Sequence, residues 1–364
     1  MTTVLRIADI FRQVLVPFLI GAAALFIVLL VALVVQRVIR SSIDRRRALL
    51  ESRFQPLVDR WLSERATPED RARLLRFGRR SPLLLGRMIV APLLSFSGGP
   101  VALGAGLAVD AGVAETWRQD IRHRQWWRRA EAIRSLGVIK DAGSFLAMAV
   151  ALDDDHEEVR AAAVEALGRL GDFRAVQELL ARIPEQSRHQ RVRIVDALRT
   201  LGADGGPALM ESIRRRPDVL PFVADLVPAI CGGAATEECL ALCGHGDAPV
   251  RAAALNVLGT IGLDDAGFYY ALKSLADDDA GVRAMAARAL GRSGRDDAAT
   301  YLGEHLQEGN WTVAAESARA LLGLHAAGAS VLAASATGDG QAAALAKQML
   351  WERQARARAS AGGA

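Results

Sequence analysis

A short pattern that recurs about every 31 residues constrains the fold of this chain more than any other feature. The pattern reads V-R-x-x-A-x-x-A-L-G, and its first full copy is Val159–Gly168. A fixed period of this length indicates an array in which each unit buries its apolar face against its neighbours. We therefore predict an all-α chain with an α-solenoid of seven or eight two-helix units over residues 126–352. Further copies begin at Arg129, Arg191, Val250, Val282 and Val313, with a degenerate copy near 220–230 and a terminal one near 341–351.

The sequence within one unit explains how two helices would form. A first helix over 142–152 ends at the acidic turn Asp153–Asp155, whose carboxylates are placed to cap the second helix. Gly168 or Gly171 then permits a sharp exit into the next unit. Only 5% of the chain is aromatic, and its apolar residues are mostly Ala, Leu and Val, which suits helix-on-helix packing. The second helix presents an apolar stripe of Val159, Ala162, Ala163, Ala166, Leu167 and Leu170.

These features resemble the HEAT-like repeat family, in particular a short bacterial form similar to the repeats of phycobilin lyases. The match is best at 153–168, 247–259 and 278–291. In such repeats the arginine bonds an acidic turn residue of a neighbouring unit, so the resemblance implies a structural ladder through the array. The implied ladder residues are Arg160, Arg251, Arg283, Asp154, Asp247 and Asp278.

One unit departs from the pattern. Phe222 stands where the arginine is expected, and Pro221 and Pro228 interrupt the second helix. Proline lacks an N–H and clashes with the preceding helical turn, so we expect a local kink or altered curvature in this, the fourth unit.

An uncharged run from Val14 to Val35 indicates a membrane anchor. Its 22 residues would form a helix of about 33 Å, which matches a hydrocarbon core of about 30 Å. A cleavable signal peptide would have a shorter apolar region and a small-residue cleavage site. We expect a transmembrane helix at 14–36 and a short extracytoplasmic N-terminus at 1–13.

Basic residues follow the anchor and predict its orientation. Because Arg and Lys stay on the cytoplasmic side, the repeat domain is expected in the cytoplasm, at an inner membrane crossed once. The same arginines could hold anionic lipid, and a solvated helix face would explain some of them equally well. The membrane-proximal basic residues are Arg37, Arg40, Arg45, Arg46 and Arg47.

Residues 37–125 are read as a basic juxtamembrane and helical cap region, with a strong helix start at Thr67. The apolar, glycine-rich segment 82–114 fits either this cap or a second membrane segment, and its prolines and glycines favour the cap. A second span would move the repeats outside the cell. Trp117, Trp126 and Trp127 lie among arginines, so they form either a lipid or partner interface or the packing of the first repeat.

The charge changes sign along the chain. Residues 37–129 contain 19 arginines against 9 Asp and Glu, whereas residues 130–364 contain 24 Lys and Arg against 31 Asp and Glu. An acidic array argues for a protein partner and against nucleic acid.

The chain offers little catalytic chemistry. Cys231, Cys239, Cys243 and His245 could in principle bind a metal, but their spacing lacks a C-x2-C pair and cysteine is an ordinary small core residue. A di-iron hydroxylase built of similar repeats needs four His-Glu pairs, and here only His156-Glu157 occurs. No P-loop or nucleophile-elbow motif is present in the sequence. We expect no catalytic residues, no metal and no cofactor.

The sequence therefore predicts a membrane-tethered, non-enzymatic scaffold that binds a membrane-associated protein. The alternatives are a HEAT-like lyase or metal-dependent modifying enzyme and a self-associating structural protein. The resemblance to bacterial proteins of this layout implies an accessory subunit of an envelope process such as polysaccharide synthesis. Residues 353–364 are expected to form a flexible tail.

Overall fold

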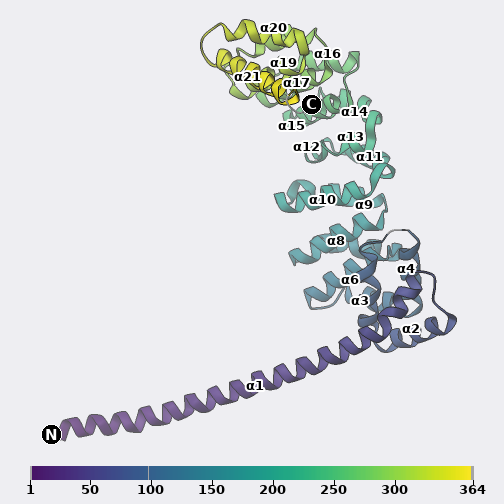
Figure 1. Ribbon diagram of the computed structural model, residues 1–364, viewed down its shortest axis with the longest axis vertical. Coiled ribbons are helices and arrows are strands. Elements are labelled where there is room, and N and C mark those ends of the chain that lie inside the picture. Colours follow the sequence, from purple (N-terminus) through teal and green to yellow (C-terminus); the bar gives the residue numbers. More distant parts are fainter. Residues whose placement is uncertain (1, 97, 362–364) are drawn as a thin grey trace. The chain divides into compact units, whose positions relative to one another are not determined.

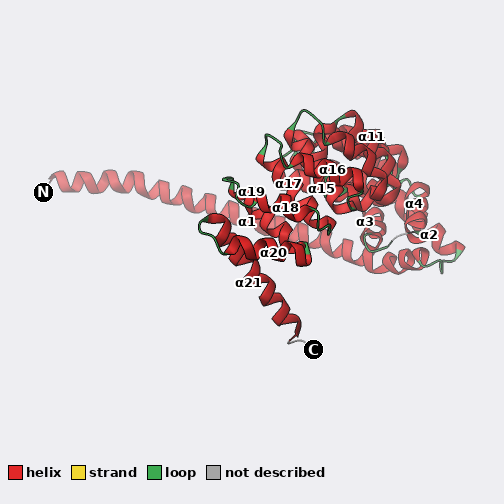
Figure 2. Ribbon diagram, turned by 90° about the horizontal axis from the view of Figure 1, so that it is seen from above, coloured by secondary structure: helices red, strands yellow, loops and turns green. Residues whose placement is uncertain are grey.

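The structure is a computed structural model that describes residues 2–96 and 98–361. Over these residues the regular elements are all helices, and no strand occurs among them (Figure 2). The chain divides into two compact units, Met1–Thr116 and Trp117–Ala364, called unit 1 and unit 2 below.

A single helix, α1 (Thr2–Leu62), runs through the predicted anchor and the basic segment that follows it. It is the one described helix long and apolar enough to cross a membrane, unless a bent pair at Pro217–Val223 and Val227–Leu242 is counted as a second span. The large apolar side chains from Leu25 to Ile39 are all exposed. Such a surface is unfavourable in water, at about 25 cal/mol per Å² of apolar area.

The end of α1 packs in unit 1 with α2 (Pro68–Arg80), α3 (Pro82–Leu93) and α4 (Gly99–Asp110). The helix start expected at Thr67 is present, because the Thr67 hydroxyl accepts a hydrogen bond from the Asp70 N–H at 3.2 Å. The Asp70 carboxylate accepts one in return from the Thr67 N–H. Segment 82–114 contains α3 and α4, each of 12 residues or about 18 Å, which is shorter than a bilayer core.

Unit 2 is an α-solenoid, as predicted. Its helices follow one another in chain order (Figure 1), beginning with α5 (Val113–Asp120), which spans the boundary between the units. The first helices of the pairs are α7 (Phe145–Val150), α9 (Arg174–Arg182), α11 (Gly206–Arg215), α14 (Thr236–Leu242), α16 (Asp265–Ser274), α18 (Ala298–His305) and α20 (His325–Ala336). The second helices are α6 (Trp126–Val138), α8 (Glu157–Leu170), α10 (Arg188–Thr200), α15 (Ala248–Ile261), α17 (Ala280–Ser293), α19 (Trp311–Gly323) and α21 (Gln341–Ala361). Short 3-10 helices connect several of them at Ala142–Ser144, Ala151–Asp153, Ile183–Glu185, Gly202–Gly205, Pro217–Val219 and Gly232–Ala235.

The glycine of the Leu-Gly step brings successive second helices into close contact. A Cβ on Gly168 would lie 2.9 Å from the Cα of Ala197 in the next unit, and one on Gly259 would lie 2.8 Å from the Cα of Ala289. Gly137 and Gly291 face Ala166 and Ala320 in the same way. Of Gly168 and Gly171, the two glycines expected to permit the exit from the helix, Gly168 therefore serves close packing. Gly171, with φ +76°, ends α8 in the left-handed conformation instead.

The kink expected in the fourth unit is present. In place of one second helix the chain forms α12 (Leu220–Val223) and α13 (Val227–Cys231). The segments that contain them, Pro217–Val223 and Val227–Leu242, are bent relative to each other by 96°. At the other end, α21 continues to Ala361, so most of the expected tail 353–364 is helical, while residues 362–364 lie outside the described part.

Candidate interaction surface

In α6, α8, α15 and α17, one arginine near the start of the helix ties it to the turn before it. The guanidinium of Arg283 donates to the carbonyls of Asp277 and Asp278, six and five residues earlier, at 2.7 and 3.0 Å. Arg251, Arg160 and Arg129 bond the carbonyls at the same two offsets. The turn carbonyls thus gain charged donors, which strengthens the junction between the two helices of a unit.

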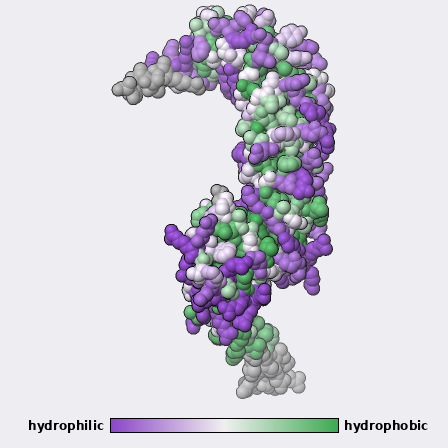
Figure 3. All heavy atoms as spheres, turned by 90° about the vertical axis from the view of Figure 1, so that its right-hand side faces the viewer, coloured by the Kyte–Doolittle hydropathy of each residue, from purple (hydrophilic) through white to green (hydrophobic). Residues whose placement is uncertain are grey.

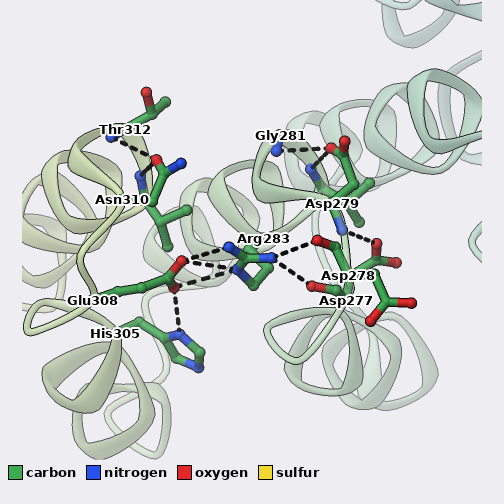
Figure 4. A network of polar contacts seen from close by, with 11 residues as sticks. Asp277, Asp278, Asp279, Gly281, Arg283, His305, Glu308, Asn310 and Thr312 are labelled. Carbon is green, nitrogen blue, oxygen red and sulfur yellow. Dashed lines mark hydrogen bonds and ion pairs between the residues drawn. The ribbon is translucent and has the colours of Figure 1, made fainter.

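Three of these arginines, Arg129, Arg251 and Arg283, also reach a carboxylate in the following repeat. Arg129 forms two bonds to Asp154, at 2.7 and 2.8 Å, and Arg251 forms two to Asp277 at the same distances. Arg283 lies between its own turn and Glu308 of the next unit, 2.6 Å from Oε1 (Figure 4). These three pairs form a ladder of the kind that the resemblance implied, with Asp154, Arg251 and Arg283 among its residues.

The ladder carboxylates are held ionised. Hydrogen bonds from Arg251 lower the pKa of Asp277, outweighing its burial. Burial alone would raise the pKa of Asp154 and Glu308, but Arg129 and Arg283, with help from His156 and His305, bring both below their usual values. The folded array therefore favours the charged carboxylates, and the stabilisation that they give is complete at neutral pH and lost in acid.

The structure corrects half of the implied ladder. Arg160 bonds only carbonyls of its own turn, and no carboxylate pairs with it among the described residues. Asp247 precedes α15 with no side-chain capping bond, and Asp278 contributes its carbonyl alone. In the pairs that form, the carboxylate lies 25 or 26 residues after the arginine, as Asp277 follows Arg251 and Glu308 follows Arg283. Glu185 stands 25 residues after Arg160, but no ion pair joins these two described residues.

Three ladder residues were not identified from the sequence: Arg129, Asp277 and Glu308. The constant offset from each arginine to the next turn was the available signal. At the kinked repeat a cation–π contact takes the place of the ion pair. The guanidinium of Arg191 lies 4.5 Å from the ring centroid of Phe222.

The three tryptophans separate into two roles. Trp117 is buried, whereas Trp126 and Trp127 at the start of α6 remain exposed by 38% and 49%. The Trp126 ring is stacked on His156 of the next unit, with centroids 4.0 Å apart. Trp126 is thus both a contact between successive repeats of unit 2 and part of the surface.

The cysteines are packed side chains. Burial raises the pKa of Cys239 and Cys243 to about 12 and that of Cys231 to about 11. His245 accepts a hydrogen bond from the Asp247 N–H. Over the described chain, no three His, Cys, Asp or Glu side chains gather to hold a metal ion.

The membrane-proximal arginines line the exposed part of α1. Arg37, Arg40, Arg45 and Arg46 are exposed, and Arg47 is half-buried and paired with Glu51 at 3.1 Å.

Large apolar side chains are exposed on two neighbouring first helices of unit 2. Leu146 and Val150, four residues apart on α7, are each 75% exposed, and Phe173 before α9 is 62% exposed. The two helices are joined where the Arg174 guanidinium lies 4.3 Å from the Phe145 ring centroid. Leu146, Val150 and Phe173 are called the apolar patch below. The face of the molecule turned toward the viewer in Figure 3 is a mosaic of hydrophilic and hydrophobic residues.

Comparisons with known proteins identify the repeats. The family described as HEAT repeats matches residues 114–203 and 236–323. No curated protein matches the chain. Among the solved structures that match the chain are three with low sequence identity and low TM-scores. The complex of CpcE and CpcF of phycocyanin lyase from Nostoc sp. PCC7120 is 19% identical, with 65% of this chain and 93% of that chain covered and a TM-score of 0.30. An engineered protein is 18% identical over 83% and 88% of the two chains, with a TM-score of 0.31. Human deoxyhypusine hydroxylase in complex with glycerol is 16% identical over 79% and 96%, with a TM-score of 0.30. The matched segments 114–203 and 236–323 are HEAT repeats, and they lie in a chain whose second unit is an α-solenoid.

Proposed function

We propose that the chain is a membrane-tethered, non-enzymatic scaffold whose repeat array binds a membrane-associated protein. The apolar, exposed length of α1 supports the tether. The arginines that follow it support placement of the array on the cytoplasmic side and contact with anionic lipid. Tethering would raise the effective concentration of a partner in the same membrane.

The apolar patch is the observation that carries the proposal. Repeat stacking accounts for the ladder arginines, because their donors are taken up by turn carbonyls and carboxylates within the array. Repeat stacking does not account for Leu146, Val150 and Phe173, because their exposed side chains bury little apolar area in the array. Clustered exposed apolar side chains are typical of protein-binding surfaces. The partner surface is therefore expected to be apolar at its centre.

The proposal is tested by capture from membranes in mild detergent. The full chain and a Leu146→Ser/Val150→Ser variant are compared with a Val192→Ser control, since Val192 is also exposed but lies on the second helix α10. We expect the same membrane protein to be enriched by the wild type and the control and lost from the double variant. Equal recovery by all three chains would contradict binding at the apolar patch.

The competing functions give different results in the same preparations. A coloured or metal-containing protein would favour a HEAT-like lyase or metal-dependent enzyme. Light scattering that reports a stable dimer, broken by the Leu146→Ser/Val150→Ser variant, would favour self-association. Both outcomes would replace the scaffold proposal, which predicts a colourless, metal-free chain that does not self-associate through this patch. An accessory role in an envelope or polysaccharide-synthesis complex would follow only from the identity of the captured protein.

A further inference from the structure

Unit 1 contains an arginine-lined cavity that the scaffold proposal does not use. Its volume is about 650 Å³, within the range of about 300–1,000 Å³ found for small-molecule sites. The residues around it come from the end of α1 and from α2, and none of those described is acidic. Its principal lining residues are Arg53, Arg73, Arg76, Arg80, Phe54 and Phe77.

An aromatic pair forms one wall of the cavity. The rings of Phe54 and Phe77 are stacked, with centroids 4.1 Å apart and planes 9° apart. Phe77 is buried, and the guanidinium of Arg53 lies 5.9 Å from the Phe54 ring centroid. The wall is therefore rigid and apolar, with positive charge beside it.

The four arginines of the cavity are not neutralised within the protein. No ion pair joins them to a carboxylate among the described residues, and Arg76 donates only to the Ala72 carbonyl at 3.3 Å. Asp70 is the acid that Arg73 influences, but its carboxylate is already bonded to Arg60 and the Thr67 N–H. The negative end of the helix dipole, at the C-terminus of α2, favours a cation at Arg80. It does not explain Arg53, Arg73 and Arg76.

We propose that this cavity binds a phosphate-bearing small molecule. Guanidinium groups match phosphate oxygens with paired hydrogen bonds, and four of them around one space suit a compact anion with more than one charge. An acidic peptide would spread its charges along a chain and leave some of these arginines unpaired. The Phe54–Phe77 wall would contact an apolar or planar part of the ligand.

The position of the cavity along α1 indicates a soluble ligand rather than a lipid headgroup. Arg53 follows Val35 by 18 residues of continuous helix, or about 27 Å. The headgroup layer on each side of a bilayer is only about 5–8 Å thick. Even a tilt of about 40° would leave the cavity about 20 Å from the hydrocarbon edge. This step rests on the proposed membrane tether, whereas the phosphate chemistry of the cavity does not.

The test is calorimetric titration of the full chain in nanodiscs with pyrophosphate. Phosphatidylcholine discs are compared with discs of equal parts phosphatidylcholine and phosphatidylglycerol. We expect saturable pyrophosphate binding in both, weakened about tenfold or more by Arg73→Ala and by Arg76→Ala. Arg76→Lys should retain part of the affinity, because a lysine keeps the charge but loses the planar fork.

Arg79→Ala is the matched control, because Arg79 is exposed on α2 but does not line the cavity. It should bind pyrophosphate like the wild type, and circular dichroism should show that all variants fold alike. No saturable binding, or equal affinity in the Arg73 and Arg79 variants, would overturn the proposal. Pyrophosphate binding that occurs in phosphatidylcholine discs but is lost in phosphatidylglycerol discs would mean that lipid headgroups occupy the cavity, and it would overturn the soluble ligand. Each of these results is independent of whether a protein partner is captured by unit 2.

Discussion

Arg251 connects three parts of the array at once: its own helix, the turn before it and the unit after it. Its guanidinium bonds the carbonyls of His245 and Gly246 and both carboxylate oxygens of Asp277. The side chains of Arg251 and Asp277 are only 17% and 14% exposed, so water replaces these bonds poorly. At this scale the sequence identified Arg251 and Arg283 correctly. It also identified Asp154, and it missed Asp277 and Glu308 because the Val-Arg motif marks the donor and leaves the acceptor open.

Arg251→Ala should lower the free energy of unfolding of the array by about 2–3 kcal/mol, since it leaves the Asp277 carboxylate and two carbonyls without a charged donor. The control is Arg199→Ala, whose pair with Asp196 is about 60% exposed on both sides. That change should stay within about 0.5 kcal/mol. The measurement is urea unfolding of the full chain followed by circular dichroism. Equal midpoints for the two variants would mean that the ladder does not stabilise the array.

Acid should weaken the array through the same carboxylates. Their pKa in the folded chain lies below the ordinary 3.8 for Asp and 4.5 for Glu, so the unfolded chain takes up protons first as the pH falls. The stabilisation is complete above those ordinary values and is lost as the pH falls through the lower folded values. Urea midpoints between about pH 6 and pH 3 should fall less steeply in Asp277→Asn than in the wild type. If the urea midpoint depends on pH equally in the variant and the wild type, protonation of Asp277 is not coupled to unfolding.

At the scale of helices, the Leu-Gly step sets the distance between successive units. The pattern located Gly168, Gly259 and Gly291 correctly, but a sequence does not show whether a glycine serves a turn or a close approach. That depends on the neighbouring helix, where Ala197, Ala289 and Ala320 lie opposite. The kink at Pro221 and Pro228 was predictable because proline acts locally.

Gly259→Ala should destabilise the array although alanine is the better helix former. A glycine-to-alanine change in an open helix position adds about 1 kcal/mol of stability. At Gly259 the new methyl group would lie 2.8 Å from Ala289, and the strain should cost about 1–3 kcal/mol. Gly106→Ala in α4 is the control, because nothing lies within 4 Å of its added Cβ and stability should rise. Thermal unfolding of both variants checks the opposite signs, and two shifts of the same sign would contradict the packing argument.

At the scale of the whole molecule, the repeat period predicted the solenoid and its kinked unit, and the uncharged run predicted one apolar helix. The exposed apolar patch was not predicted, because Leu146 and Val150 look like ordinary core residues in a helical pattern. Their exposure depends on how α7 is placed in its unit, which no local pattern records. The arginine cavity was not predicted for a similar reason. Its lining comes from both α1 and α2, and Arg53 is distant in sequence from Arg73 and Arg76.

The scaffold proposal is tested most directly by photo-cross-linking in intact membranes. A benzoylphenylalanine replaces Leu146 in the full chain, and a second chain carries it at Val192 as the control. We predict one discrete adduct with a membrane protein from position 146 and none from position 192. Adducts of equal yield at both positions, or an adduct with the mass of two copies of this chain, would contradict a scaffold that binds its partner through the apolar patch.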